Sequence, residues 1–128
     1  QVISDFRRIF FNEELLTFAD FNREHDRCLA FLKEAVSCSN ARKKIVVTHH
    51  VPSFQMQCPK FADSQANGAF TVELEDYIKD SGIDFWIYGH SHYNVDVRIG
   101  NTMCISNQLG YVFHGEHESF NPCKSVKV

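Results

Sequence analysis

The chain has 128 residues, of which 44% are hydrophobic and 23% charged, and its formal net charge is -3. This length and apolar content indicate one folded domain over residues 1–128, and they argue against a disordered chain. The weakly acidic balance gives no strong signal for nucleic-acid binding, which requires a basic surface.

The first third of the chain predicts an irregular lead-in followed by helix. Residues 1–11 mix β-branched, aromatic and basic side chains without a clear period. From Asn12 the pattern becomes helical, with Asn12 as an N-cap and acidic residues in the first turn. A longer helix is expected from about residue 21 to 36, because apolar and aromatic residues recur there at helical spacing.

Two short, β-branched or aromatic runs predict buried strands, and each is followed by histidines. Residues 45–48 lead into His49-His50, and residues 84–88 lead into Gly89-His90-Ser91-His92. A long polar loop at 53–69 and a helix at 70–79 lie between them. Strands at 94–99 and 102–106 follow, then a further short strand at 110–113 and a loosely ordered polar tail.

The order of strand, helix, strand and a β-rich end predicts the α/β class. In open α/β sheets, ligand sites lie outside the carboxyl ends of the strands, so both histidine clusters should share one crevice. Residues two apart in a strand face the same side, so His90 and His92 should aim at one site or at two adjacent ions. Gly89 should allow the backbone to bend close to its surroundings, and imidazole is a common ligand of zinc, iron and manganese.

The remaining site candidates carry weaker signals. Strand alternation directs His50 away from His49, so it is interpreted as supporting a metal ligand or packing. Asn107 either faces the substrate, supports a ligand or is a plain turn residue, and the loop at 53–67 either covers a substrate or is a surface loop. His25, His114 and His117 are interpreted as ordinary helix or tail residues.

Several segments carry a family resemblance. IVVTHHVPS at 45–53 and DFWIYGHSHYN at 84–94 resemble the last two motifs of the calcineurin-like metallophosphoesterases. The segment NGAFTVELEDYI between them, ISNQLGYVF after them and the opening SDFRRI also resemble the family, so the similarity covers nearly the whole chain. The resemblance implies an α/β fold that is the C-terminal half of a four-layer α/β/β/α metallophosphoesterase sandwich.

The same resemblance implies a site and a reaction. His49 and His90 would bind the second of two divalent metal ions, and His92 the first, with Mn, Zn or Fe as the ions and two per complete site. In this family, a hydroxide between two ions about 3.5–4 Å apart attacks phosphorus in line, so the substrate would be a phosphoester.

The chain departs from the family pattern in one respect. It contains no D-x-H, G-D-x-x-D or G-N-H motif, which carry the carboxylate ligands, the Asn ligand and the proton-donating His. No residue of this chain is therefore assigned a catalytic role. We expect the parent protein to be the metallophosphoesterase, and this chain alone, as a fragment or processed product, to bind metal weakly and to hydrolyse phosphoesters negligibly.

The same histidines are compatible with other functions. A non-catalytic domain with a structural or vestigial metal site is the alternative, although structural zinc sites usually have four ligands and often use cysteine. A histidine-triad hydrolase is excluded because Tyr93 and Asn94 follow His92 where that pattern needs another histidine.

The five widely spaced cysteines predict a reducing, cytoplasmic location. No membrane association is expected, since no apolar run has membrane-spanning length. Half a sandwich would expose an apolar edge, which predicts self-association or domain swapping.

Overall fold

The structure is a computed structural model that describes residues 3–127. The chain divides into two compact units, residues 1–40 and 41–128, and each is described by itself. Helices and strands occur together, which confirms the α/β class, whereas the single domain over 1–128 stays a prediction. Within residues 3–127, no helix is long and apolar enough to cross a membrane.

After a short 3-10 helix at Asp5–Arg7, the first unit forms a β-hairpin where the sequence predicts a helix start. Strand β1 (Phe10–Phe11) pairs antiparallel with β2 (Glu14–Leu15). Asn12 and Glu13 form the connection, with positive φ angles of 51° and 69°. Two-residue hairpin turns with positive φ match the twist of the flanking strands, and Asn tolerates this conformation better than most residues. The prediction of Asn12 as an N-cap is therefore wrong.

The long helix of the first unit is confirmed and extends beyond its predicted ends. Helix α1 runs from Phe18 to Cys38. Thr17 is its N-cap: the Thr17 hydroxyl accepts from the Asp20 amide at 3.1 Å, and the Asp20 carboxylate accepts from the Thr17 amide at 3.1 Å. This reciprocal capping box satisfies two backbone donors and sets the start of α1 three residues before the predicted one.

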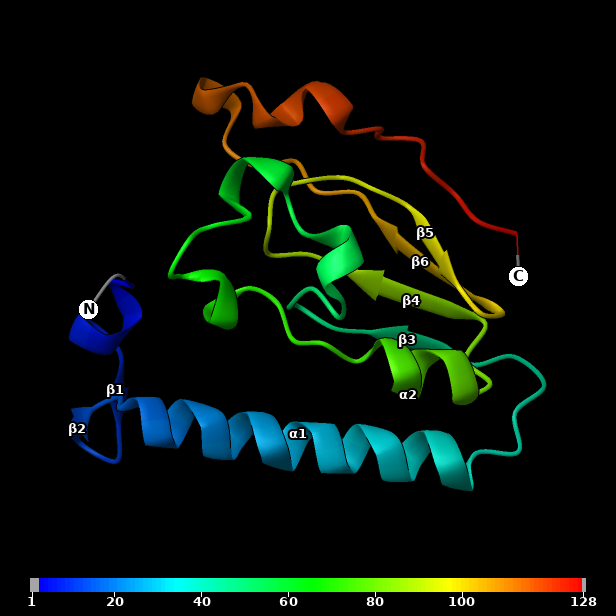
Figure 1. Ribbon diagram of the computed structural model, residues 1–128, viewed down its shortest axis with the longest axis horizontal. Coiled ribbons are helices and arrows are strands. Elements are labelled where there is room, and N and C mark those ends of the chain that lie inside the picture. Colours follow the sequence, from blue (N-terminus) through cyan, green and yellow to red (C-terminus); the bar gives the residue numbers. More distant parts are fainter. Residues whose placement is uncertain (1–2, 128) are drawn as a thin grey trace. The chain divides into compact units, whose positions relative to one another are not determined.

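The second unit is built on a four-stranded sheet with the order β3-β4-β6-β5 (Figure 1). Strands β3 (Ile45–Val47), β4 (Phe85–Tyr88) and β6 (Thr102–Ser106) are parallel, and β5 (Val97–Ile99) pairs antiparallel with β6. Each of the four lies within a range predicted from its β-branched or aromatic run. Gly100, with φ 57°, supplies the tight turn from β5 to β6.

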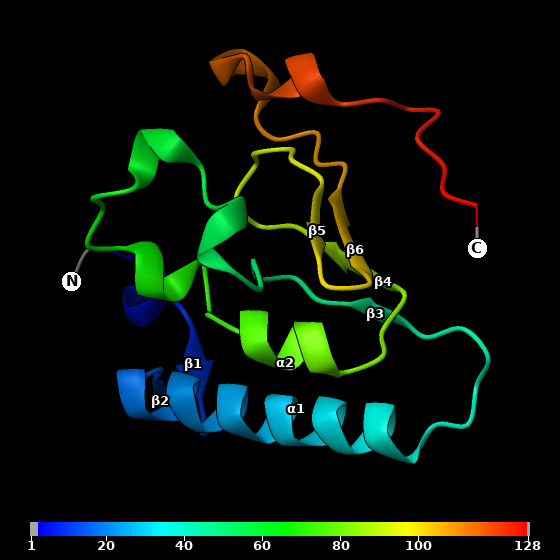
Figure 2. The same ribbon diagram turned by 45° about the vertical axis from the view of Figure 1, so that its right-hand side comes forward.

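The core of this unit lies between the sheet and helix α2 (Glu75–Asp80), which Figures 1 and 2 show against the sheet. Trp86, Ile78 and Ile83 are almost fully buried. The Thr102 hydroxyl donates to the Ile83 carbonyl at 2.6 Å, which ties β6 to the segment after α2. Helix α2 is shorter than the predicted 70–79, because Thr71 instead forms a β-bridge with Val51.

The predicted loop at 53–69 contains three short 3-10 helices, Phe54–Met56, Pro59–Phe61 and Asn67–Ala69. Met56 is completely buried, so its side chain anchors the first of these turns in the core. The segment is therefore structured, although it lacks an α-helix or a strand.

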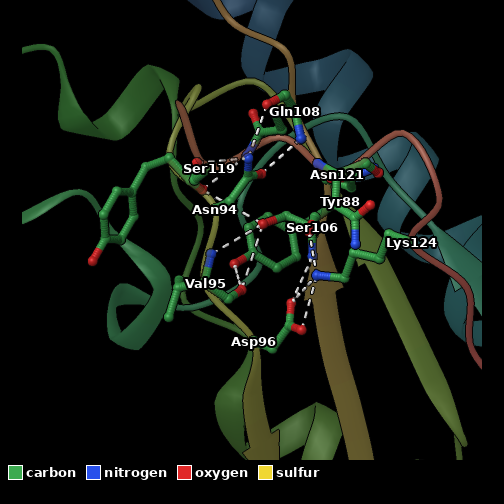
Figure 3. A network of polar contacts seen from close by, with 11 residues as sticks. Tyr88, Asn94, Val95, Asp96, Ser106, Gln108, Ser119, Asn121 and Lys124 are labelled. Atoms are coloured by element: carbon green, nitrogen blue, oxygen red, sulfur yellow. Dashed lines mark hydrogen bonds and ion pairs between the residues drawn. The ribbon is translucent and has the colours of Figure 1, made fainter. Parts of the chain in front are cut away.

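The C-terminal segment differs from its prediction. Residues 112–114 form a 3-10 helix rather than a strand, and a second one follows at Glu116–Ser119. Figure 3 shows how the tail is fixed: the Lys124 ammonium donates to both Asp96 carboxylate oxygens, at 2.7 and 2.8 Å, and to the Ser106 carbonyl at 2.7 Å. These charge-assisted bonds give a polar tail a defined course, so the prediction of a loosely ordered tail is wrong.

Candidate functional site

The ends of β3 and β4 bring two histidine segments together. The strands are parallel and in register, with Val47 opposite Ile87, so both end at the same edge of the sheet. The Gly89 amide donates to the His49 carbonyl at 3.1 Å, and the His49 and His90 ring centroids lie 4.7 Å apart. The His50 ring also lies close to His90, with centroids 4.8 Å apart. Strand alternation does not direct His50 away, because β3 ends at Val47.

The Gly-His-Ser-His segment is a strained turn and not the end of a strand. His90 and His92 have positive φ angles of 68° and 50°, which only a few per cent of residues other than glycine adopt. The Ser91 amide donates to the Gly89 carbonyl at 2.8 Å, so His90 is the central residue of a three-residue γ-turn. Period-two alternation is therefore the wrong reason for grouping the two histidines. Backbone strain of this kind concentrates at functional sites.

Two amide side chains hold this turn, and both were missed by sequence analysis. The Gln108 side-chain carbonyl accepts from the His92 amide at 2.8 Å, and its Nε2 donates to the Tyr93 carbonyl at 3.0 Å. Asn94 binds the Gln108 backbone on both sides: its Oδ1 accepts from the amide at 2.6 Å and its Nδ2 donates to the carbonyl at 2.8 Å (Figure 3). Nothing in the sequence distinguishes these amides from surface residues.

Asn107, the candidate chosen from the sequence, lies next to Gln108 and binds the tail instead. Its Nδ2 donates to the Asn121 carbonyl at 2.8 Å, and its Oδ1 accepts from the Asn121 amide at 2.9 Å. A role for Asn107 facing a substrate stays a prediction.

His92 contacts a carboxylate that the sequence analysis treated as part of a loose tail. Its Nδ1 lies 2.9 Å from Glu116 Oε2, which also accepts from the Tyr111 amide at 2.6 Å. The Tyr111 amide, followed by His92, lowers the pKa of Glu116 below its usual value, although partial desolvation opposes the shift. Gly110, with φ 63°, makes this packing fit, because a Cβ there would lie 2.6 Å from Glu116 Cβ and 3.2 Å from His92 Cβ.

A cavity of about 450 Å³ opens beside the turn. His90 and His92 both line it, together with side chains of the segment 57–71 and of the C-terminal segment, whereas His49 is not part of the lining. This is the size of a small-molecule site. The long loop thus forms the wall of a cavity next to the histidines.

The histidines fit a metal site in part. Neighbouring imidazoles are ligands that zinc, manganese and iron accept. In the described part of the chain, however, no group of three or more His, Cys, Asp or Glu side chains is close enough to hold a metal ion. His49, His90 and His92 therefore contribute donors to one region without completing a site, and their assignment as metal ligands stays a prediction.

Comparison with known proteins gives the same result as the fold and the two histidine segments. The chain belongs to the calcineurin-like phosphoesterase family, whose profile matches residues 3–94, a range that includes His49, His90 and His92. The resemblance inferred from the two histidine motifs is thereby confirmed. The assignment to the C-terminal half of a four-layer sandwich stays a prediction.

One relative is the uncharacterized protein L509 of Acanthamoeba polyphaga mimivirus, which is 28% identical over 120 residues. The match covers 88% of this chain but only 41% of the relative, so the chain spans about two fifths of the relative's length. No solved structure matches the chain.

Proposed function

We propose that this chain supplies the histidine ligands of a metal-dependent phosphoesterase, the activity belonging to the whole protein. Family membership supports hydrolysis of phosphoesters as the general kind of reaction. The observation that carries the proposal is the pairing of His49 and His90 at the ends of two adjacent parallel strands, with ring centroids 4.7 Å apart. His49 and His90 each follow one of these strands by two residues, and ligands anchored close to rigid elements are held more precisely than ligands on mobile loops.

The roles of individual residues follow from their positions. His49 and His90 would bind one divalent ion, Mn, Zn or Fe, and His92 would bind its neighbour. When bound, such ions neutralise charge on phosphoryl oxygens and activate water. Gln108 fixes the backbone at His92 by accepting its amide hydrogen, and Glu116 fixes the His92 ring through Nδ1. With Nδ1 held by a carboxylate, Nε2 is the nitrogen left for a ligand.

The chain by itself is expected to be a poor catalyst. It lacks the D-x-H, G-D-x-x-D and G-N-H motifs, and its described residues form no three-ligand group. The latter observation also favours a second candidate, a non-catalytic domain with a vestigial metal site. The two candidates differ in what the complete gene product does: only the first predicts metal-dependent hydrolysis.

Calorimetric titration with Mn²⁺ and Zn²⁺ tests the ligand assignment. We expect weak binding by the chain that is reduced by His49→Ala, by His90→Ala and by His92→Ala. His117→Ala, a histidine of the tail, is the control and should bind as the unmodified chain does. Metal binding that survives all three substitutions would remove the basis of the proposal.

Hydrolysis is measured on the complete gene product with 4-nitrophenyl phosphate. The expected result is turnover that is lost after chelation, restored by metal and abolished by His90→Ala. A complete gene product that binds metal through these histidines but never turns over would favour the vestigial site.

A further inference from the structure

The cavity beside His90 and His92 is walled by aromatic rings. Phe61, Phe70 and Tyr111 line it, and the exposed fractions of Phe61 and Tyr111 are 50% and 53%. Half-exposed aromatic side chains around a concave surface are typical of ligand sites, since a bound apolar group would cover them. Phe70 stacks on the His90 ring, with centroids 4.4 Å apart and an interplanar angle of 23°. The aromatic wall is thus continuous with His90 at the end of β4.

The wall is held in shape by its own polar contacts. Asn67 Nδ2 donates to the carbonyls of Phe61 and Ala62, both at 2.8 Å, which fixes the turn that presents the Phe61 ring. Gln57 also lines the cavity, and its Nε2 is buried without a hydrogen-bond partner among the described residues. Because that nitrogen is shielded from solvent, Gln57 contributes to the wall of the cavity and is assigned no hydrogen bond to a bound molecule.

The charges around the cavity limit what it can hold. No Lys or Arg is among its described lining residues, and Glu116 is its one carboxylate. The nearby Lys60 ammonium lies over the Phe61 ring, 5.3 Å from the centroid, and is not part of the lining. Phosphate groups beyond the reacting one would find no cation in the cavity and would face Glu116. Polyphosphates and highly charged sugar phosphates are therefore poor matches.

We propose that this cavity binds the aromatic organic group of a phosphoester that carries a single phosphate. The ring packs between Phe61 and Tyr111, and the phosphate lies at His90 and His92. The inference rests on the proposed function, because it identifies the substrate class of that site. Aryl and nucleobase-bearing phosphoesters belong to this class, whereas glycerol phosphates and pyrophosphates do not.

Two phosphonates that differ only in their organic group test the proposal. Phenylphosphonate and methylphosphonate carry the same head group and are not hydrolysed, and pyrophosphate serves as the polyphosphate probe. Binding to the chain is measured by nuclear magnetic resonance titration with and without Mn²⁺. We expect phenylphosphonate to bind about tenfold more tightly than methylphosphonate, since aromatic stacking and apolar burial act on the phenyl ring alone. Pyrophosphate should bind no better than methylphosphonate.

Substitutions of the lining residues show which side chains cause the preference for phenylphosphonate over methylphosphonate. Phe61→Ala and Tyr111→Ala should bring the ratio of the two affinities close to one. Phe61→Leu preserves bulk for the case in which alanine impairs folding, and it should reduce the ratio partially. Phe54→Ala is the matched control, because Phe54 is 53% exposed but does not line the cavity.

The outcomes separate this inference from the proposed function. Equal binding of the two phosphonates, or a preference for pyrophosphate, overturns the substrate class even if Mn²⁺ tightens binding through His90. A phenyl preference that disappears in Phe61→Ala supports the cavity assignment. If Mn²⁺ and His90→Ala then change neither affinity, the proposed function fails while the aromatic site stands.

Discussion

Of the two glycines beside the histidines, Gly110 leaves less room for a side chain than Gly89 does. From the sequence, Gly89 is predicted to be the glycine at which the backbone comes close to its surroundings, because it precedes His90. A Cβ on Gly89 would lie 3.5 Å from the His49 carbonyl oxygen, an ordinary contact, whereas one on Gly110 would lie 2.6 Å from Glu116 Cβ. Gly110 also has a positive φ, at which any side chain is strained.

This contrast predicts different costs for the same substitution. Gly110→Ala should lower the free energy of unfolding by about 1–3 kcal/mol, because it combines positive φ with steric overlap. Gly89→Ala should change the same quantity by less than about 1 kcal/mol. Urea denaturation of both variants provides the measurement. Equal costs at the two positions would show that the Gly110 turn relaxes easily.

Glu116 predicts the tautomer of His92. The carboxylate accepts a hydrogen bond from Nδ1 at 2.9 Å, so the neutral ring should carry its proton on Nδ1 and leave Nε2 unprotonated. Glu116→Ala should mix the two tautomers and, where metal binds, weaken its affinity by about 10–100-fold. Nitrogen-15 chemical shifts of the imidazole report the tautomer without any metal. Glu118→Ala, two residues away, is the control, and an unchanged His92 spectrum in Glu116→Ala would contradict the prediction.

At the scale of elements, prediction succeeded where the signal is local. The β-branched run at Ile45 and the aromatic run at Phe85 identify β3 and β4, and their parallel pairing explains why His49 and His90 meet. Failures occurred where a local pattern fits two structures. Asn12 suits an N-cap or a hairpin turn equally well, and only the pairing of Phe10 with Leu15 decides between them.

The rest of the site depends on contacts between residues far apart in the sequence. His92 and Glu116 are separated by 24 residues in the sequence. Gln108, which accepts a hydrogen bond from the His92 amide, lies 16 residues from His92. No periodicity records such pairs, so the sequence pointed to Asn107 when the neighbouring Gln108 holds the turn. The left-handed backbone of His90 could not be predicted from the sequence either, because histidine prefers positive φ much less strongly than glycine does.

Asp84 links the beginnings of β3 and β4, and this link predicts a pH dependence. Its carboxylate accepts from Lys43 Nζ and from the Lys44 amide, both at 2.9 Å, and the Lys43 bond is the largest cause of a pKa lowered from 3.8. A depressed pKa in the folded state stabilises the fold above pH 3.8, and this contribution is lost as pH falls through the folded value. Asp84→Asn should therefore be less stable than the unmodified chain at pH 6, with the difference shrinking below pH 3.8. Unfolding curves measured from pH 3 to pH 6 test this prediction, with Asp63→Asn as the control. A stability difference between Asp84→Asn and the unmodified chain that stays constant with pH would contradict it.

At the scale of the whole molecule, β3 matters for association with other copies, because it is an edge strand of the four-stranded sheet. Within residues 3–127 no strand pairs with its outer side, and Val47 and Ile45 are 70% and 47% exposed. Unpaired edge strands with apolar side chains tend to recruit another strand. We propose that the isolated chain self-associates through this edge, by strand pairing or domain swapping.

Light scattering coupled to size exclusion tests the edge. The mass should rise with concentration for the unmodified chain and remain that of a monomer for Val47→Lys, since a charge on an edge strand discourages pairing. Val126→Lys alters a 39% exposed apolar residue of the tail and should associate like the unmodified chain. A monomer at every concentration would rule out association through β3.

The position of Trp86 gives this protein an internal optical probe. It is the only tryptophan in the sequence, its side chain is fully buried in β4, and its Nε1 donates to the Thr48 hydroxyl at 2.9 Å, one residue before His49. The tryptophan fluorescence therefore originates close to His49. A paramagnetic ion such as Mn²⁺ held there would quench the emission, so occupancy of the site can be followed in the unlabelled protein.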